Sequence, residues 1–141
     1  MEIQGYHMPD DLYYEPNHYW IRVEGDSLVM GMDDFARQLA GDIVYVQLPS
    51  EGKKIKTGKS FAKVESGKWL GKVYAPVNGV IEEVNEELEE DPSLINEDCY
   101  GGGWMYRIKP DDMAELDNLV KGPEAVEKWL LAEIEKYVEN D

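Results

Sequence analysis

Short runs of β-forming residues, separated by glycine and proline, fill most of the first 110 residues of this chain. Strand-breaking residues such as Pro49, Gly58 and Gly79 lie between the runs. Strands of this length and spacing predict a mainly β fold of the sandwich or flattened-barrel type. The expected strands cover 19–23, 27–31, 43–48, 60–65, 72–75, 80–84 and 104–109.

Two helices are expected beside the strands. Asp33 and Asp34 can cap a short helix that runs through Gln38, because a carboxylate accepts the free amides of a first helical turn. The second helix starts after Gly122 and covers about 124–138, where it packs on one side of the β core. The segment 110–121 is a weaker candidate for a short helix. The apolar stripe of the C-terminal helix consists of Val126, Trp129, Leu130, Ile134, Tyr137 and Val138.

Length and composition favour one globular unit. A chain of 141 residues with 43% hydrophobic residues suits a single domain, 1–141, with a continuous core. No apolar run is long enough for a membrane span, and the first residues lack the pattern of a secretory signal. Cys99 is the single cysteine, which fits a reducing, cytoplasmic environment.

Charge is distributed unevenly along the chain. The formal net charge of −16 excludes nucleic-acid binding through clustered basic residues. Nevertheless, 53–72 holds seven lysines, half of the 14 basic residues, against Glu65 alone, and 82–98 holds nine acidic residues and no basic one. Two interpretations stay open: ordinary solvated surface, or a local field that orients partner proteins.

The sequence contains no convincing catalytic or metal site. His7 and His18 have no cysteine or HxxxH partner, so both are expected to be structural or surface residues. Cys99 has acidic neighbours that disfavour a thiolate, and the glycines at 101–103 precede a strand instead of a phosphate-binding helix. We therefore expect a protein that is not an enzyme.

The lysine at position 68 has an unusual setting. Strand-like residues run into Glu65 and resume by Val73, and Gly67 and Gly71 lie on either side of Lys68. This pattern places Lys68 near the tip of a β-hairpin, with its amine exposed to a modifying enzyme. From spacing alone, an ordinary turn lysine remains the simpler reading.

Five ordered motifs resemble the H-protein family of the glycine cleavage system, over roughly residues 13–138. Residues 17–21 resemble the family's EHEWV strand, and 64–68 its VESVK lipoylation motif. The segments 31–36 and 39–49 resemble its GITDYA and LGDIVFVELP blocks. Residues 74–79 resemble YAPVSG, and 84–104 contain the pieces of VNE and LVNEDPYGEGW.

The resemblance implies a hammerhead-like hybrid barrel-sandwich with a C-terminal α-helix, and lipoate amide-linked to Lys68. It also implies a carrier that moves the aminomethyl group of glycine from the P protein to the T protein, with reoxidation by the L protein. A lipoyl ligase or transferase would attach the arm. Glu65 resembles the acid that such enzymes recognise, and Gly79 the glycine that turns the adjoining strand. Ser66, Gly67 and Trp69 complete the expected arm surroundings.

Three departures from the family pattern leave alternatives open. Gly67 replaces a valine, 69–72 replaces small residues with Trp-Leu-Gly-Lys, and Cys99 and Gly102 replace Pro and Glu. With these changes around Lys68, the chain resembles lipoate-binding proteins that carry sulfur intermediates for heterodisulfide-reductase-like enzymes. A non-lipoylated interaction scaffold is the third reading. We expect Trp69 to lie on the surface within a partner footprint, so that its removal leaves stability nearly unaltered.

Overall fold

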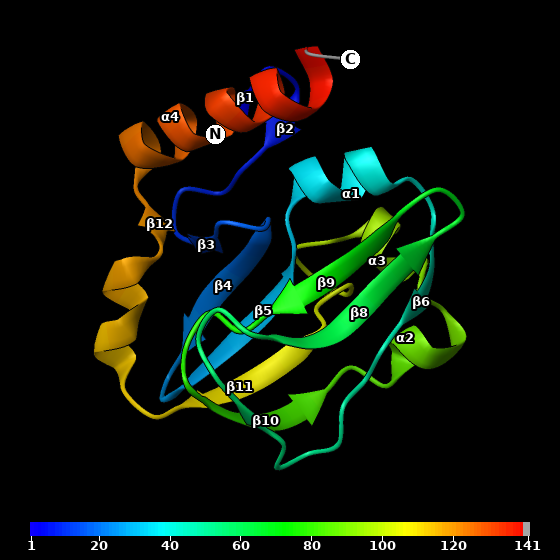
Figure 1. The fold of residues 1–141 in the computed structure, drawn as a ribbon, viewed down its shortest axis with the longest axis vertical. Coiled ribbons are helices and arrows are strands. Elements are labelled where there is room, and N and C mark those ends of the chain that lie inside the picture. Colours follow the sequence, from blue (N-terminus) through cyan, green and yellow to red (C-terminus); the bar gives the residue numbers. More distant parts are fainter. Residues whose placement is uncertain (140–141) are drawn as a thin grey trace.

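Antiparallel β-sheets make up most of the computed structural model, which describes residues 1–139 (Figure 1). One sheet has the strand order β12-β3-β4-β5-β11-β10-β7, a second has the order β6-β8-β9, and β1 pairs with β2. The strands are β1 (Glu2–Ile3), β2 (Tyr6–His7), β3 (Tyr13–Glu15), β4 (Tyr19–Glu24), β5 (Ser27–Met32), β6 (Ile43–Val46), β7 (Lys54–Ile55), β8 (Ser60–Ser66), β9 (Leu70–Tyr74), β10 (Gly79–Val84), β11 (Tyr106–Pro110) and β12 (Val120–Lys121).

All seven strands predicted from the sequence are present, with ends that shift by up to two residues. The very short strands β1, β2, β3, β7 and β12 were not predicted, nor were the one-turn helices α2 (Glu87–Glu90) and α3 (Leu94–Glu97). The weaker helix candidate at 110–121 corresponds to the 3₁₀ helix η1 (Met113–Asn118). None of the helices in the described part of the chain has the length and apolarity that a membrane span requires.

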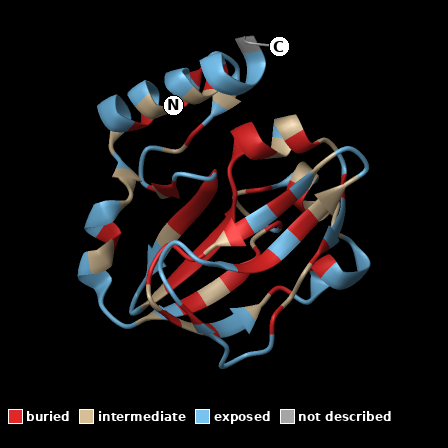
Figure 2. Cartoon of the chain, viewed as in Figure 1, coloured by how far each residue is buried: buried red, intermediate tan, exposed pale blue. Residues whose placement is uncertain are grey.

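The main core fills the space between the two larger sheets. Met30, Ile81 and Ile108 of the seven-stranded sheet belong to the same buried cluster as Val64 and Val73 of the three-stranded sheet. Figure 2 shows buried residues along β8 and β9 alternating with exposed ones. Because successive side chains of a strand point to opposite faces, this alternation fixes which residues of the small sheet face solvent.

Helix α1 (Asp34–Ala40) begins where the acidic pair predicted it and continues two residues beyond Gln38. Asp33 is the N-cap: one of its carboxylate oxygens accepts a hydrogen bond from the amide of Ala36 at 2.9 Å. This bond satisfies one of the free amides of the first turn. The helix ends at Gly41, whose amide donates to the carbonyl of Arg37.

Helix α4 (Pro123–Ile134) is shorter than the predicted 124–138, although the chain remains helical in a π-turn, η2 (Glu135–Glu139). Val126, Leu130 and Ile134 are buried as predicted. The prediction for Tyr137 and Val138 was wrong, because they are 45% and 40% exposed. Tyr137 nevertheless stays on the packed side of the helix, because its ring lies 6.4 Å from that of Phe35 between centroids.

His18 connects three parts of the fold. It lies in the turn between β3 and β4 with φ of 77°, a backbone region that few non-glycine residues adopt. Its Nδ1 lies 3.1 Å from the carboxylate of Asp33 at the start of α1, and its Nε2 lies 2.8 Å from that of Glu133 on α4. The imidazole also stacks on Trp129 at 4.7 Å and contacts Phe35 at 4.6 Å. His18 therefore has the structural role expected of it, and it ties α4 to the β-sheet.

The charged neighbours of His18 determine its protonation. Burial alone would lower the pKa of this imidazole, but the carboxylates of Asp33 and Glu133 outweigh burial and raise it. The nearby Glu15 carboxylate also interacts with His18, and burial raises the pKa of Glu15. Carboxylates therefore surround the imidazole on β3, α1 and α4, and they favour its charged form.

We predict that this network makes stability depend on pH. A raised folded-state pKa gives stabilisation that is complete below about pH 6.5 and is lost as pH rises through the raised value. At pH 6, His18→Asn should lower the free energy of unfolding by about 3 kcal/mol, because it leaves buried carboxylates without their cation. Asparagine is chosen because it tolerates positive φ.

Urea unfolding of both proteins from pH 6 to pH 9 measures this effect. The gap between parent and variant should narrow as pH rises. A gap that stays constant or widens would show that His18 is neutral in the folded protein at pH 6.

Candidate functional site

The hairpin of β8 and β9 ends in a two-residue loop made of Gly67 and Lys68. The amide of Ser66 donates to the carbonyl of Trp69 at 2.8 Å and closes the hairpin just before the loop. The strands pair in register below it, with Glu65 opposite Leu70. The lysine predicted to lie at a hairpin tip therefore occupies the second position of the loop, and it is exposed.

The side chain of Lys68 lies over the backbone of Gly41. A Cβ atom at position 41 would be 3.1 Å from Cε of Lys68 and 3.7 Å from its Nζ. Gly41 has φ of 77°, so both its backbone and the space above it suit glycine. Within residues 1–139 the Lys68 amine forms no ion pair or hydrogen bond. A hollow of about 410 Å³ surrounds it, lined by Ala40, Gly41, Asp42, Val44, Gly67 and Lys68.

Asn96 on α3 fixes the backbone of the segment 41–43, which borders the hollow around Lys68. Its amide nitrogen donates to the carbonyl of Gly41 at 2.8 Å, and its oxygen accepts from the amide of Ile43 at 2.9 Å. Neither Gly41 nor Asn96 was predicted as a site residue from the sequence. A glycine directly after the predicted short helix was an available signal for Gly41. Nothing local pointed to Asn96, because it acts across 55 residues of sequence.

Glu65, Ser66 and Gly67 precede Lys68 in the hairpin. Glu65 is half-buried on β8, and its carboxylate lies 4.0 Å from the ammonium of Lys63. The hydroxyl of Ser66 accepts a hydrogen bond from the amide of Lys68 at 3.3 Å. A Cβ at Gly67 would meet nothing within 4 Å, so packing does not require glycine there. Their part in lipoylation stays a prediction.

Gly79 lies in the other large sheet, at the start of β10, and does not line the hollow around Lys68. It pairs with Ile55 on one side and Pro110 on the other. A Cβ at this position would lie 2.3 Å from the carbonyl oxygen of Lys109. The close approach of β11 therefore explains this glycine, whereas its role near the arm stays a prediction.

Trp69 was predicted to lie on the surface, instead of the core, within a partner footprint; it lies only partly at the surface, and the footprint stays a prediction. Trp69 is half-buried and packs against the main core. Its ring covers Gly71, where a Cβ would be only 1.9 Å from the indole. The missing side chain at position 71 makes the space that the indole fills, so the large Trp69 depends on the small Gly71.

A cleft of about 180 Å³ opens on the side of the hairpin where Trp69 lies. Trp69 and Gly71 line it together with His18 and Glu133 of the buried network. Its wall is therefore built from the hairpin, the β3–β4 turn, α1 and α4. The remaining lining residues are Pro16, Asn17, Tyr19, Phe35, Ala36, Leu39, Lys72, Tyr74 and Tyr137.

Other reactive groups in the described residues have structural surroundings. Cys99 is buried, and burial, followed by the charge of Asp34, raises the pKa of its thiol to about 12. A thiol of this kind is inert as a nucleophile. No group of three or more His, Cys, Asp or Glu side chains in residues 1–139 is arranged to hold a metal ion.

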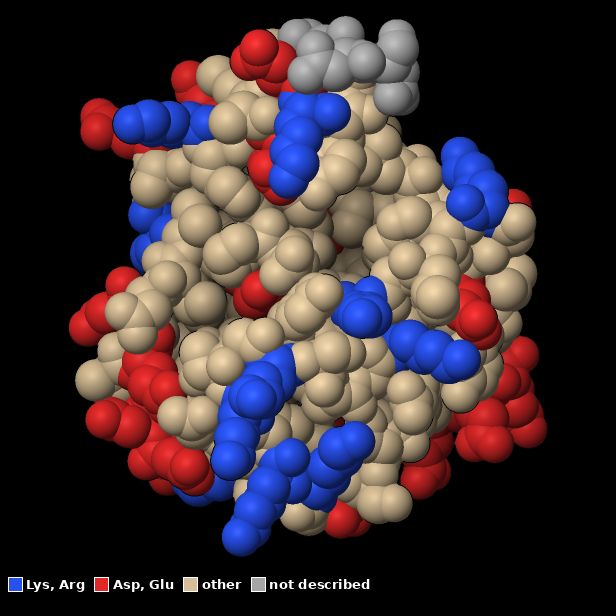
Figure 3. Space-filling model, viewed as in Figure 1, with Lys and Arg blue, Asp and Glu red and all other residues tan. Residues whose placement is uncertain are grey.

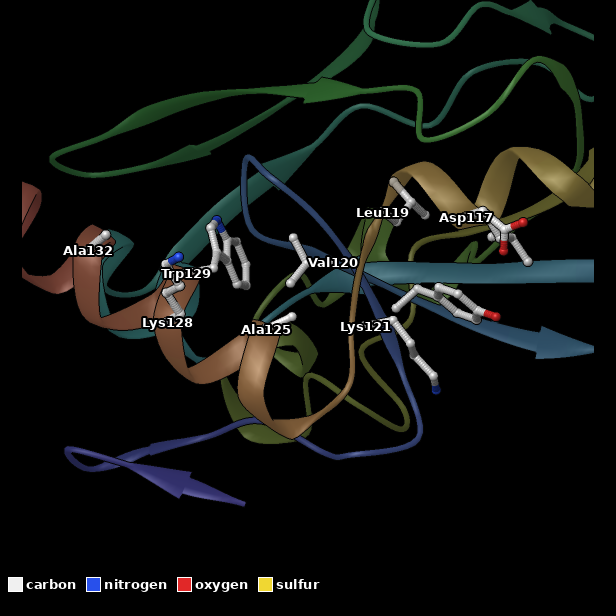
Figure 4. A pocket seen from close by; sticks show the side chains of 10 residues that line it. Asp117, Leu119, Val120, Lys121, Ala125, Lys128, Trp129 and Ala132 are labelled. Carbon is white, nitrogen blue, oxygen red and sulfur yellow. The ribbon is translucent and has the colours of Figure 1, made fainter.

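A wider hollow of about 650 Å³ lies between η1, β12 and α4 (Figure 4). Its walls include Val120, Lys121 and Trp129, and it shares no residue with the β8–β9 hairpin. The ammonium of Lys121 lies 4.7 Å from the ring of Tyr13, another lining residue. This hollow is thus separate from the surroundings of Lys68.

Comparison with known proteins agrees with the resemblance found in the sequence. The family model described as glycine cleavage H-protein matches residues 12–132. The glycine cleavage system H protein of Carboxydothermus hydrogenoformans is 48% identical over 123 residues, which cover 87% of this chain and 94% of that protein. The corresponding protein of Thermus thermophilus is 46% identical over 113 residues, which cover 80% and 88%.

The fold agrees as well. The crystal structure of a glycine cleavage system H protein from Mycobacterium marinum matches with a TM-score of 0.70 and 34% sequence identity, over 79% of this chain and 97% of that one. The predicted mainly β class with a C-terminal helix is confirmed. The chain belongs to the glycine cleavage H-protein family, the non-catalytic lipoyl carriers of the glycine cleavage system.

Proposed function

We propose that this carrier bears its lipoyl group on Lys68, in amide linkage to the side-chain nitrogen. The observation that carries the proposal is the position of Lys68 in a two-residue hairpin loop, exposed and with an amine that no neighbour in residues 1–139 binds. Amide formation removes the lysine charge, and here it would break no ion pair. When bound, the lipoyl group supplies the disulfide that accepts the aminomethyl group of glycine.

The residues around Lys68 position the attachment point. Paired strands and the inward-facing Val64 and Val73 hold the hairpin rigidly on the core. Gly41 leaves room for the lysine stem to lie along the surface or swing away from it. A rigid base with a mobile arm suits a carrier, because it presents one group to several active sites at high local concentration.

Membership of the glycine cleavage system implies P, T and L proteins as partners. We infer that residues 1–141 act as one carrier domain that delivers the aminomethyl group from the P protein to the T protein. Glu65 and Ser66 are the residues that we expect the lipoylating enzyme to recognise. The sulfur-carrier alternative rested on the changed residues 69–72 after Lys68, and the match of the chain to glycine cleavage H proteins favours glycine cleavage instead.

Lipoylation at Lys68 can be tested by mass. Protein produced with lipoate and an active lipoyl ligase should show one lipoyl addition, and Lys68→Arg should show none, because the guanidinium does not form this amide. Lys72→Arg is the matched control on the same hairpin and should keep the addition. If the addition persists in Lys68→Arg, or disappears only in Lys72→Arg, the assignment is wrong.

The packing of Trp69 generates a second prediction. Trp69→Ala should lower the free energy of unfolding by about 2 kcal/mol, because it removes a half-buried indole and leaves the space above Gly71 empty. Leu70→Ala is the control: Leu70 is 61% exposed, and its loss should change stability by only about 0.5 kcal/mol or less. Chemical denaturation of the three proteins measures both values. Equal stability of the parent and Trp69→Ala would restore the surface interpretation of Trp69.

A further inference from the structure

The outer face of the β6-β8-β9 sheet combines basic and apolar side chains. Strand register aligns Tyr45, Glu65 and Leu70 in one row across the three strands. The next row places Lys63 of β8 directly opposite Lys72 of β9. The alternation of β8 and β9 turns both rows away from the core. We call this set the carrier face; with Lys68 at the hairpin tip it consists of Tyr45, Lys63, Glu65, Lys68, Leu70 and Lys72.

The lysine pair on this face does not serve folding. Like charges directly opposite each other across two strands are destabilising. Lys63 is only partly compensated, by the Glu65 carboxylate at 4.0 Å and the Tyr45 ring at 5.8 Å. Lys72 forms no ion pair within residues 1–139. Because this cost to stability is only partly compensated within the protein, we infer that the two charges act on another molecule.

The apolar members of the face are exposed to an unusual degree. Leu70 is 61% and Tyr45 42% exposed, and Val44, next to Tyr45 on β6, is 60% exposed. Single exposed apolar residues are common on protein surfaces. Here, however, they lie beside the lysine pair and directly below the hairpin tip. Tyr45 and Leu70 lie on either side of Glu65, and the lysine pair forms the adjacent row. A surface that combines exposed apolar and charged side chains in this way is typical of protein–protein interfaces.

The charge of the face contrasts with the rest of the chain. Figure 3 shows basic side chains gathered over β8 and β9 and over the loop beside them, whereas acidic side chains gather at the periphery. Helix α2, which packs beside β6, carries Glu87, Glu89 and Glu90. The net charge of −16 would repel a nucleic acid or an anionic membrane at longer range. A protein with a local group of carboxylates beside apolar side chains matches the lysine row and the exposed Tyr45 and Leu70.

We propose that the carrier face is the docking surface for an enzyme whose entrance for the arm presents carboxylates beside an apolar contact. This inference rests on the proposed function, since the face surrounds Lys68 and gains its meaning from the arm attached there. Docking through the face aligns the hairpin tip with that entrance. Complementary charges increase the rate of encounter and fix its orientation.

Charge reversal at Lys72 tests the proposal, with purified P protein as the probe and fully lipoylated carrier as its substrate. Lys72→Glu should raise the KM for the carrier about fivefold at low ionic strength and leave kcat within about twofold, because an exposed charge at an interface governs encounter. Lys128→Glu on α4 changes the net charge equally and should leave the KM unchanged. The KM of the parent should rise with added salt, and that of Lys72→Glu should rise less, because Lys63 remains.

Stability separates docking from a structural role. Lys72→Glu places opposite charges across the strands with Lys63, so its thermal midpoint should equal or exceed that of the parent while its KM rises. Leu70→Ser tests the apolar contact: it should raise the KM about threefold, whereas Leu131→Ser on α4 should not. An unchanged or lower KM in both Lys72→Glu and Leu70→Ser would overturn the docking proposal.

The proposed function is checked first and separately, by the intact mass of each protein before the assay. Complete lipoylation together with unchanged KM values contradicts the docking surface alone. A parent protein that is not modified at Lys68 contradicts the proposed function and the docking surface that depends on it.

Discussion

The pairing of β8 with β9 is the constraint on which the functional part of this molecule depends. Their inward residues, such as Val64 and Val73, are fully buried between the two larger sheets, so the register of the hairpin cannot slip without moving them into solvent. A fixed register leaves Gly67 and Lys68 as a two-residue loop and turns Lys63 and Lys72 outward. The attachment point and the face around it are thus consequences of core packing.

The surroundings of the hairpin are joined by polar contacts that span long stretches of sequence. Asn96 fixes the Gly41 backbone under the lysine stem, and His18 connects the start of α1 to Glu133 on α4. His18 and Glu133 also line the cleft beside Trp69, so the C-terminal helix contributes to the same region as the hairpin. A non-catalytic carrier needs this rigidity, because its partners must find the arm at one place.

The sequence predicted the strands and the hairpin lysine because these depend on local signals, namely alternation, glycine punctuation and ordered family motifs. Prediction from the sequence failed where the structure depends on contacts between residues far apart in the chain, or on an irregular helix end. The helical stripe could not show that Tyr137 would remain exposed, and composition could not show that the missing side chain of Gly71 makes room for Trp69. Gly41 and Asn96 were missed because their roles exist only after α1 and α3 pack together.

The central claim is that Lys68 carries the group derived from glycine. The most direct measurement incubates lipoylated protein with P protein and glycine labelled at its methylene carbon, and then maps the label after trypsin digestion. A modified Lys68 resists cleavage, so the account predicts label on a single peptide spanning residues 64–72. Label on any other peptide, or no label on fully lipoylated protein with active P protein, would contradict the account.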